Sequence, residues 1–235
     1  MKNRTCSFRS DVTIIGRIPL FPESAIRDEP ALRGCPVDWA RLHGGPIIRA
    51  FLDALPADWL ADPTTRIRTM PVWLRAGWGS GYVGWHLDSV LPREDGQEDW
   101  VHGRPPLFER IGCNMGTNAP TRLLIGDVTL TDYPAGQPVG GLWHRQLDEA
   151  VAAGRAREIP AQEGDLFRLT SSSFHSLAAA SRDGWRMFFD ANRHTPGTKL
   201  FPPVELFYDE METDFQPTDA REAALMSPYH ASDPR

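Results

Sequence analysis

His86, Asp88 and His175 are the residues whose types and spacing could bind a metal ion. His86 and Asp88 are two positions apart in the run 82–88, whose alternation predicts a strand entering a turn, so both side chains would point to one face. His175 adds an imidazole from a second predicted strand. Two imidazoles and one carboxylate hold Fe(II) while leaving coordination positions open for reactants. The same set also suits Zn(II).

Arg186 follows His175 by eleven residues, in a strongly β-like run. Alternation along that run places Arg186 and Phe188 on one face and Met187 on the other. An inward guanidinium can hold a carboxylate through two parallel hydrogen bonds, which suits the far end of a dicarboxylic co-substrate. Arg182 is a competing candidate, although its neighbours predict a turn.

Residues 67–191 have the pattern of a mainly β domain, with short apolar runs between Gly, Pro, Asn and Asp. The candidate strands are 67–75, 82–86, 122–125, 128–133, 141–144, 156–159, 165–170, 175–179 and 185–190. One helix-like insert is expected at 147–153, and the Pro- and acid-rich segment 91–110 predicts a long loop beside the metal ligands. Many short strands favour a sandwich or barrel over alternating βαβ units.

The regions flanking this core complete a single domain spanning residues 1–235. Residues 1–66 predict a strand at 11–18 and a helix in two pieces within 37–55, the second of which starts at Pro46. Its apolar residues recur at helical spacing, so one face should pack on a sheet. Residues 192–235 form an acidic, polar C-terminal extension.

The composition of the chain limits the kinds of partner and location that we expect for the protein. A net charge of -6 disfavours tight binding to nucleic acid. No long apolar run or secretory leader is visible, so neither a membrane span nor export is expected. The three cysteines, Cys6, Cys35 and Cys113, are widely spaced, which fits a reducing cytoplasm better than a disulfide framework. A monomer and a homodimer fit equally well.

The chain resembles the 2-oxoglutarate/Fe(II) oxygenase superfamily. The residues that carry the resemblance are the His-x-Asp motif at 86–88, the Gly-Asp turn at 164–165, His175 and Arg186. It covers about residues 67–191 and implies a double-stranded β-helix, or jelly roll, with flanking N-terminal helices. It further implies that the two histidines and the aspartate bind Fe(II), and that the arginine binds the distal carboxylate of 2-oxoglutarate.

The resemblance also implies a reaction class. 2-Oxoglutarate and O2 would be consumed, succinate and CO2 released, and a substrate hydroxylated or otherwise oxidised. Halogenation is disfavoured because family halogenases usually lack the carboxylate that Asp88 supplies here. The protein itself would hold the ligands, orient the substrate and exclude water.

Five further residues are candidates for substrate binding. Arg75, Trp78 and Trp85 cluster before and within the first metal strand, where they could wall a pocket for an anionic or aromatic substrate. The alternative for the tryptophans is core packing. Asn114 and Arg122, which follow the metal turn, could contact substrate or co-substrate.

Four functions remain open on these residues. The first is a small-molecule oxygenase, which the acidic charge and compact size favour. The second is an oxygenase of nucleobases or protein side chains, for which only arginines such as Arg66, Arg68 and Arg75 suggest a basic groove. The third is a non-catalytic jelly roll that binds a ligand, and the fourth is a zinc hydrolase. Arg186 favours iron and 2-oxoglutarate over the last two.

Overall fold

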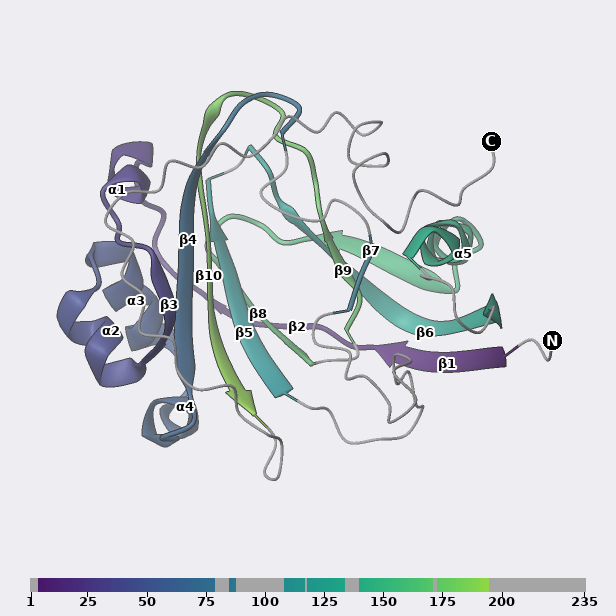
Figure 1. Cartoon of the computed structure of the whole chain (residues 1–235), viewed down its shortest axis with the longest axis horizontal. Helices are drawn as coiled ribbons and strands as arrows, with labels where there is room; N and C mark the ends of the chain where they lie inside the picture. The colour runs from purple at the N-terminus through teal and green to yellow at the C-terminus, as the bar shows by residue number, and fades with distance from the viewer. Residues whose placement is uncertain are drawn as a thin grey trace.

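The computed structural model describes residues 4–78, 85–87, 108–116, 118–133, 140–170 and 173–194. In this part of the chain, two antiparallel sheets lie between a group of short helices on one flank and a single helix on the other (Figure 1). Asp88, most of the loop predicted at 91–110 and the extension beyond 194 lie outside the described residues. None of the helices in the described ranges is long and apolar enough to cross a membrane.

The larger sheet, here the major sheet, has six strands in the order β2-β8-β5-β10-β4-β3. Their bounds are β2 Thr13–Arg17, β8 Asp165–Thr170, β5 Phe108–Met115, β10 Gly184–His194, β4 Arg66–Leu74 and β3 Leu32–Pro36. β10 lies between β5 and β4 and pairs with both along most of its length, from Gly184 opposite Leu74 to His194 opposite Phe108. Residues 187–192 of β10 are therefore flanked by a strand on both sides.

The smaller sheet, here the minor sheet, is built around one long strand, β6. Its strands are β1 Arg4–Ser10, β6 Thr121–Tyr133, β7 Ala156–Pro160 and β9 His175–Leu177. β6 pairs with all three of the others, and an isolated bridge between His86 and His175 extends the sheet beyond β9.

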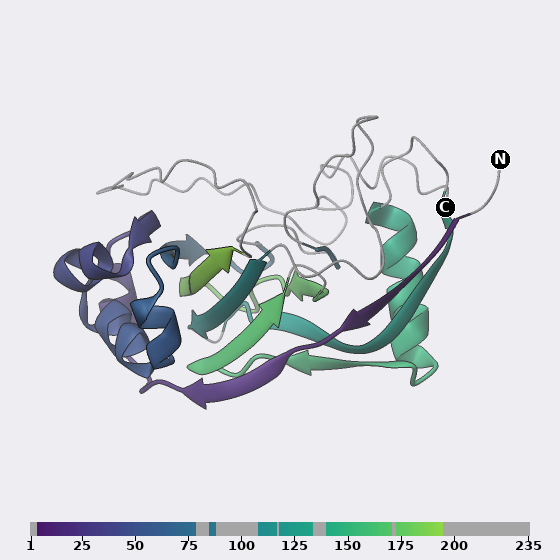
Figure 2. The same ribbon diagram turned by 90° about the horizontal axis from the view of Figure 1, so that it is seen from below.

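The chain alternates between the two sheets after β4. It passes to the minor sheet at His86, returns to β5, forms β6 and β7, and then places β8 in the major sheet, β9 in the minor and β10 in the major. The inner faces pack on each other, with Leu123 and Ala161 against Phe167 and Leu169 (Figures 1 and 2). This alternation is the one that a jelly roll requires, and the predicted mainly β fold with N-terminal helices is confirmed.

Four short helices cover the outer face of the major sheet (Figure 1). They are α1 Glu23–Arg27, α2 Val37–His43, α3 Pro46–Ala54 and α4 Ala57–Ala61. α2 and α3 confirm the helix predicted in two pieces. Phe51 of α3 meets Phe189 of β10 edge to face, with ring centroids 4.9 Å apart. The buried carboxylate of Glu29 accepts the backbone N–H groups of Gly45 and Ile47 at the start of α3, which fixes that helix to the sheet.

The remaining helix, α5 Gly140–Ala152, packs on the outer face of the minor sheet through Leu147 and Ala150. The strand predicted at 141–144 is therefore wrong, because these residues belong to the first turns of α5. A short apolar run is compatible with either element, and here the helical spacing of the residues that follow decides.

Three strands, β1, β3 and β5, were absent from the prediction and one was divided. In β5 the adjacent charges of Glu109 and Arg110, followed by Gly112, interrupt the apolar run that would have indicated a strand. β6 runs unbroken through Gly126, where the sequence predicts two strands. β1 pairs with β6, β2 with β8 and β3 with β4, so the N-terminal residues form part of the sheets themselves.

Gly116, just after β5, lies against the backbone of β10, so a substitution there measures how tightly β10 is packed. It has a φ of 90°, and an added Cβ would lie 2.4 Å from the carbonyl oxygen of Trp185. Gly77 has a similar φ of 85° but nothing within 4 Å. We expect Gly77→Ala to lower the free energy of unfolding by about 1–2 kcal/mol, the cost of the left-handed backbone alone. Gly116→Ala should lower it by at least about 3 kcal/mol because β10 must also move.

Urea unfolding of both variants checks this difference. Equal losses of stability in Gly116→Ala and Gly77→Ala would show that β10 does not press on Gly116.

Candidate active site

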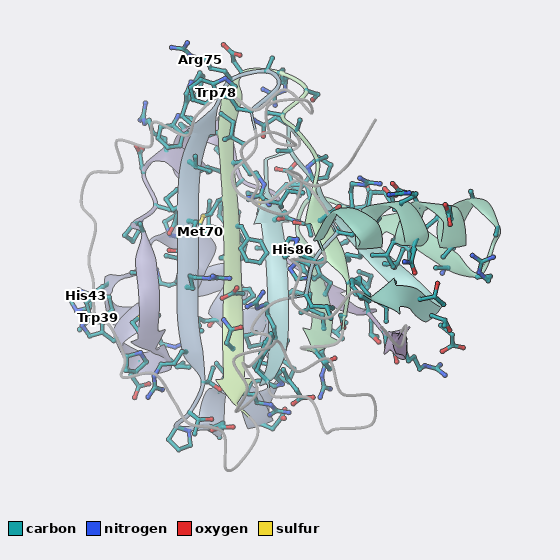
Figure 3. The ribbon with its side chains drawn as sticks, turned by 45° about the vertical axis from the view of Figure 1, so that its right-hand side comes forward. Trp39, His43, Met70, Arg75, Trp78 and His86 are labelled. Atoms are coloured by element: carbon teal, nitrogen blue, oxygen red, sulfur yellow. The ribbon has the colours of Figure 1, made fainter. Side chains whose placement is uncertain are left out.

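His86 and His175 lie side by side at the edge of the minor sheet. The N–H of His86 donates to the carbonyl of His175 at 2.9 Å, and the reverse bond is 3.1 Å long. Their ring centroids are 4.3 Å apart with the planes tilted by 55°. Residues bridged in this way present their side chains on one face. The structure thus brings together two of the three predicted metal ligands, and Figure 3 shows His86 between the sheets.

The turn before β9 orients the imidazole of His175. Its Nδ1 lies 3.1 Å from the carbonyl oxygen of Ser173, an acceptor, so Nδ1 carries the proton and Nε2 presents its lone pair. Metal-binding histidines are commonly oriented by such a bond. Two hydrogen bonds to the N-terminal segment anchor this turn. Ser173 Oγ donates to the carbonyl of Asp11 at 2.6 Å, and the N–H of Phe174 donates to Ser10 Oγ.

The histidine pair faces the major sheet. His175 stands opposite Leu123 in the pairing of β9 with β6, so both side chains lie on one face. Leu123 packs among Phe108, Phe167 and Leu169 of the major sheet. The two imidazoles therefore belong to the inner side of the jelly roll, where a bound group would be shielded from bulk water.

Arg186 lies fully buried on the inner face of the major sheet. Its Nε donates to the carbonyl of Ala119 at 2.7 Å, and its Nη2 donates to Asn114 Oδ1 at 2.9 Å and to Thr121 Oγ1 at 3.2 Å. Burial lowers the pKa of Arg186 to about 10, which still leaves it cationic at neutral pH. Removal from water also strengthens its attraction for an anion.

The faces of β10 confirm the predicted alternation. The guanidinium of Arg186 lies 5.8 Å from the ring of Phe188, on the inner side. Met187 and Phe189 are buried on the other side, under the helices. The competing candidate, Arg182, sits in the turn before β10 with 56% of its side chain exposed.

Asn114 and Thr121 complete the surroundings of Arg186. Asn114 Oδ1 accepts from Thr121 Oγ1 at 3.0 Å as well as from Arg186. Asn114 is 1% exposed, and its Nδ2 finds no acceptor within the described part of the chain. Buried amide donors are nearly always paired, so this group suits a ligand with acceptor oxygens. Thr121 is not singled out by the sequence, although alternation from Leu123 along β6 would place it on the same face.

Trp85 and Arg122 lie on the opposite face of the minor sheet from the histidine pair. The Trp85 indole is 2% exposed and donates to Asp148 of α5 at 3.0 Å. Arg122 lies 4.8 Å from the Trp85 ring and binds both carboxylate oxygens of Glu158, at 2.7 and 2.6 Å. The structure therefore places these two predicted substrate contacts under α5, where they support the backbone next to His86.

Arg75 and Trp78 lie beyond the end of β4, away from His86 (Figure 3). Arg75 is exposed and stacks on Trp78 at 5.2 Å. Trp78 packs against a cluster that includes Val72 and Ala119, and the Ala119 carbonyl is the one that binds Arg186. Trp78 therefore lies near the residues that surround Arg186 and away from the histidine pair.

The third predicted metal ligand, Asp88, lies outside the described residues. Within the ranges that the structure describes, no three His, Cys, Asp or Glu side chains gather closely enough to hold a metal ion. The pair of imidazoles fits two positions of a metal site, and a carboxylate two residues after His86 would share its face if the strand continued.

No protein-family model and no curated protein matches this sequence. Several solved structures are similar to it. An N-substituted L-amino acid dioxygenase from Burkholderia ambifaria AMMD is 16% identical, over 79% of this chain and 84% of that one, with a TM-score of 0.40. AviO1 from Streptomyces viridochromogenes Tue57 is 13% identical, over 83% and 94%, with a TM-score of 0.41.

Iron-bound HygX from Streptomyces hygroscopicus is 13% identical, over 80% of this chain and 84% of that one, with a TM-score of 0.35. These identities and scores are low, so the function rests on the geometry of this chain itself.

The Arg122–Glu158 pair gives a pH-dependent prediction. The hydrogen bond from Arg122 holds the pKa of Glu158 below its ordinary value. A carboxylate with a lowered pKa stabilises the fold above its ordinary pKa of about 4.3, and this stability is lost as the pH falls through the lowered value. Glu158→Gln should therefore unfold about 0.5–1 kcal/mol more easily at pH 7, and the difference should vanish in acid.

Urea unfolding at a series of pH values measures this, with Glu149→Gln on the exposed side of α5 as the control. A difference between wild type and Glu158→Gln that stays constant down to pH 3 would contradict it.

Proposed function

We propose that this protein is a non-haem Fe(II) oxygenase of the 2-oxoglutarate-dependent superfamily, which oxidises a small molecule and releases succinate and CO2. The observation that carries the proposal is the placement of the His86–His175 pair and the buried guanidinium of Arg186 on facing inner surfaces of one jelly roll. A metal site and an anion site so arranged can hold the two ends of a single 2-oxo diacid.

His86, Asp88 and His175 would hold the iron. The proton on Nδ1 of His175 leaves its Nε2 as a donor to the metal, and the bridge between the histidines fixes the spacing of their rings. Bound Fe(II) would activate O2, with the keto acid as the co-substrate that is oxidised. The surrounding apolar side chains, such as Leu123, would keep bulk water from the site.

Arg186, Asn114 and Thr121 would bind the distal carboxylate of 2-oxoglutarate. The guanidinium offers a rigid fork, and the Nδ2 of Asn114 offers a buried donor that needs an acceptor. Thr121 lies two positions before Leu123, which stands opposite His175, so the anion site and the imidazoles share one inner side. The carboxylate would thus lie deep in the fold with its keto end toward the histidines.

A small-molecule substrate remains the better proposal over nucleic acid, since the chain carries a net charge of -6. A cytoplasmic monomer or homodimer remains the expectation for its location and assembly.

The metal site can be tested without turnover. His175→Ala should weaken anaerobic Fe(II) binding at least about 100-fold, since even the loss of a residue that merely orients a ligand costs about 10- to 100-fold. His43→Ala is the matched control, because His43 is an exposed histidine stacked on Trp39 of α2. Isothermal titration calorimetry measures both. Equal Fe(II) affinity in the two variants would remove His175 from the site, and tight Zn(II) binding without 2-oxoglutarate binding would favour a hydrolase.

Variants of Arg186 and Arg182 test which of the two arginines binds the co-substrate. Arg186→Gln should raise the 2-oxoglutarate concentration for half-saturation about 10- to 100-fold, the effect of losing a charged hydrogen-bond pair. Arg182→Ala should leave it unchanged. The measurements are the anaerobic Fe(II)–2-oxoglutarate charge-transfer absorption and slow succinate formation without substrate. The opposite result, with Arg182→Ala impaired and Arg186→Gln normal, would reassign the anion site, and no absorption in wild type would refute 2-oxoglutarate binding.

A further inference from the structure

The two N-terminal strands, β1 and β2, run along the edges of both sheets. β1 pairs with β6 at one edge of the minor sheet, and β2 pairs with β8 at one edge of the major sheet. Figures 1 and 2 show them in purple as one ribbon, residues 4–17, that crosses from sheet to sheet. The crossing lies between Ser10 and Thr13, beside the turn that precedes His175. This N-terminal ribbon therefore reaches the segment that carries a proposed metal ligand.

Ser10 lies where two strands follow each other along one edge of β6. β7 and β9 pair with the same residues of β6, so they lie on opposite edges, and β1 lies on the edge away from β7. The N–H of Leu124 donates to the carbonyl of Phe174 just before β9, and the pairing with β1 begins at Gly126, opposite Ser10. A break between two such strands leaves backbone groups that need other partners.

The hydroxyl of Ser10 bonds to two of these backbone groups. Its Oγ donates to the carbonyl of Leu124 at 2.5 Å and accepts the N–H of Phe174 at 2.9 Å. Ser10 is 1% exposed, and both of its partners belong to fully buried residues. An alanine in this position would leave a buried carbonyl and a buried N–H without that partner, which is costly for the local structure.

A second bond joins the same ribbon to the turn. Ser173 Oγ donates to the carbonyl of Asp11 at 2.6 Å, and the carbonyl of Ser173 itself lies 3.1 Å from Nδ1 of His175. Phe174, which Ser10 holds, is the residue between them in the chain. The position of the acceptor for Nδ1, and with it the direction of the Nε2 lone pair, is thus set by bonds to residues 10 and 11.

We propose that Ser10 is a positioning residue for His175, so that the N-terminal ribbon is part of the metal site. The proposal rests on the function proposed above, in which His175 binds Fe(II) through Nε2. The effect of Ser10 passes through the backbone of residues 173–175, whose carbonyl at Ser173 selects the tautomer of the imidazole. Loss of a residue that orients a metal ligand weakens metal binding about 10- to 100-fold.

Thr69 provides a matched control for Ser10. Its Oγ1 donates to the carbonyl of Pro30 at 2.8 Å and accepts the N–H of Leu32 at 2.7 Å, and Thr69 is also 1% exposed. It stands opposite Phe189, on the helix-covered face of the major sheet. Thr69→Val therefore removes the same two kinds of hydrogen bond as Ser10→Ala, but on the face of the major sheet that points away from the histidines.

The first test titrates Fe(II) alone into the anaerobic full-length protein by calorimetry. Ser10→Ala should bind Fe(II) at least about tenfold more weakly than wild type, whereas Thr69→Val should bind it as wild type does. Ser10→Thr keeps the hydroxyl and should restore most of the affinity. Equal Fe(II) affinity in Ser10→Ala and wild type, or equal losses in Ser10→Ala and Thr69→Val, would overturn the proposal.

The second test needs no metal. Long-range ¹H–¹⁵N NMR spectra of the metal-free protein at about pH 8, above the ordinary histidine pKa of about 6.5, show which ring nitrogen carries the proton. The His175 signals are those that disappear in His175→Ala. We expect the proton on Nδ1 in wild type and Thr69→Val, and a mixture of both tautomers in Ser10→Ala. An unchanged tautomer in Ser10→Ala would refute the positioning role.

The two tests separate the two proposals. If wild type binds no Fe(II), the proposed function fails, and the tautomer of His175 in Ser10→Ala still decides the role of Ser10. The Tm of each variant reports folding. If Ser10→Ala does not fold, Ser10→Cys replaces it in both tests, because a thiol is a weaker hydrogen-bonding group than a hydroxyl and should produce the same changes.

Discussion

The whole site depends on the double pairing of β10. This strand is held between β4 and β5, so its two faces are fixed in opposite environments. On one face, Met187 and Phe189 are buried under the N-terminal helices. On the other, Arg186 and Asp190 are fully buried with hydrogen-bonding partners. Removing charged groups from water is costly unless they are well paired, and the apolar packing on the helix side offsets that cost while holding the backbone in place.

Two arginines on the inner face of the major sheet, Arg186 of β10 and Arg68 of β4, have different surroundings. Arg186 donates to neutral oxygens of Ala119, Asn114 and Thr121. Arg68 instead binds Asp190, which positions it while Arg110 adds a second positive charge nearby. Phe188 lies between the two guanidiniums and separates them by an apolar surface.

The minor sheet has a different task, which is to hold the imidazoles at a fixed spacing. The mutual hydrogen bonds of His86 and His175 make their backbone a short piece of sheet. On the outer side, Trp85 is clamped between Asp148 of α5 and Arg122. Trp85, the neighbour of the proposed metal ligand His86, is thereby fixed from the outer side by α5. This arrangement keeps the outer face for support and the inner face for reactants.

The sequence by itself determined what depends on local geometry. A strand has a side-chain period of two whatever it pairs with, so the inward direction of Arg186 and Phe188 and the shared face of a His-x-Asp motif follow from spacing alone. The mainly β texture and the helices at 37–43 and 46–54 likewise follow from local patterns.

Only the tertiary structure decided which distant residues meet. Arg68 and Asp190 are 122 positions apart, and nothing local in the chain links them. Trp85 turns toward α5, where it packs with Leu147 and donates to Asp148, a residue 63 positions away in the chain. Register between sheets is set by the burial of whole faces, and that is a property of the folded chain rather than of any segment of it.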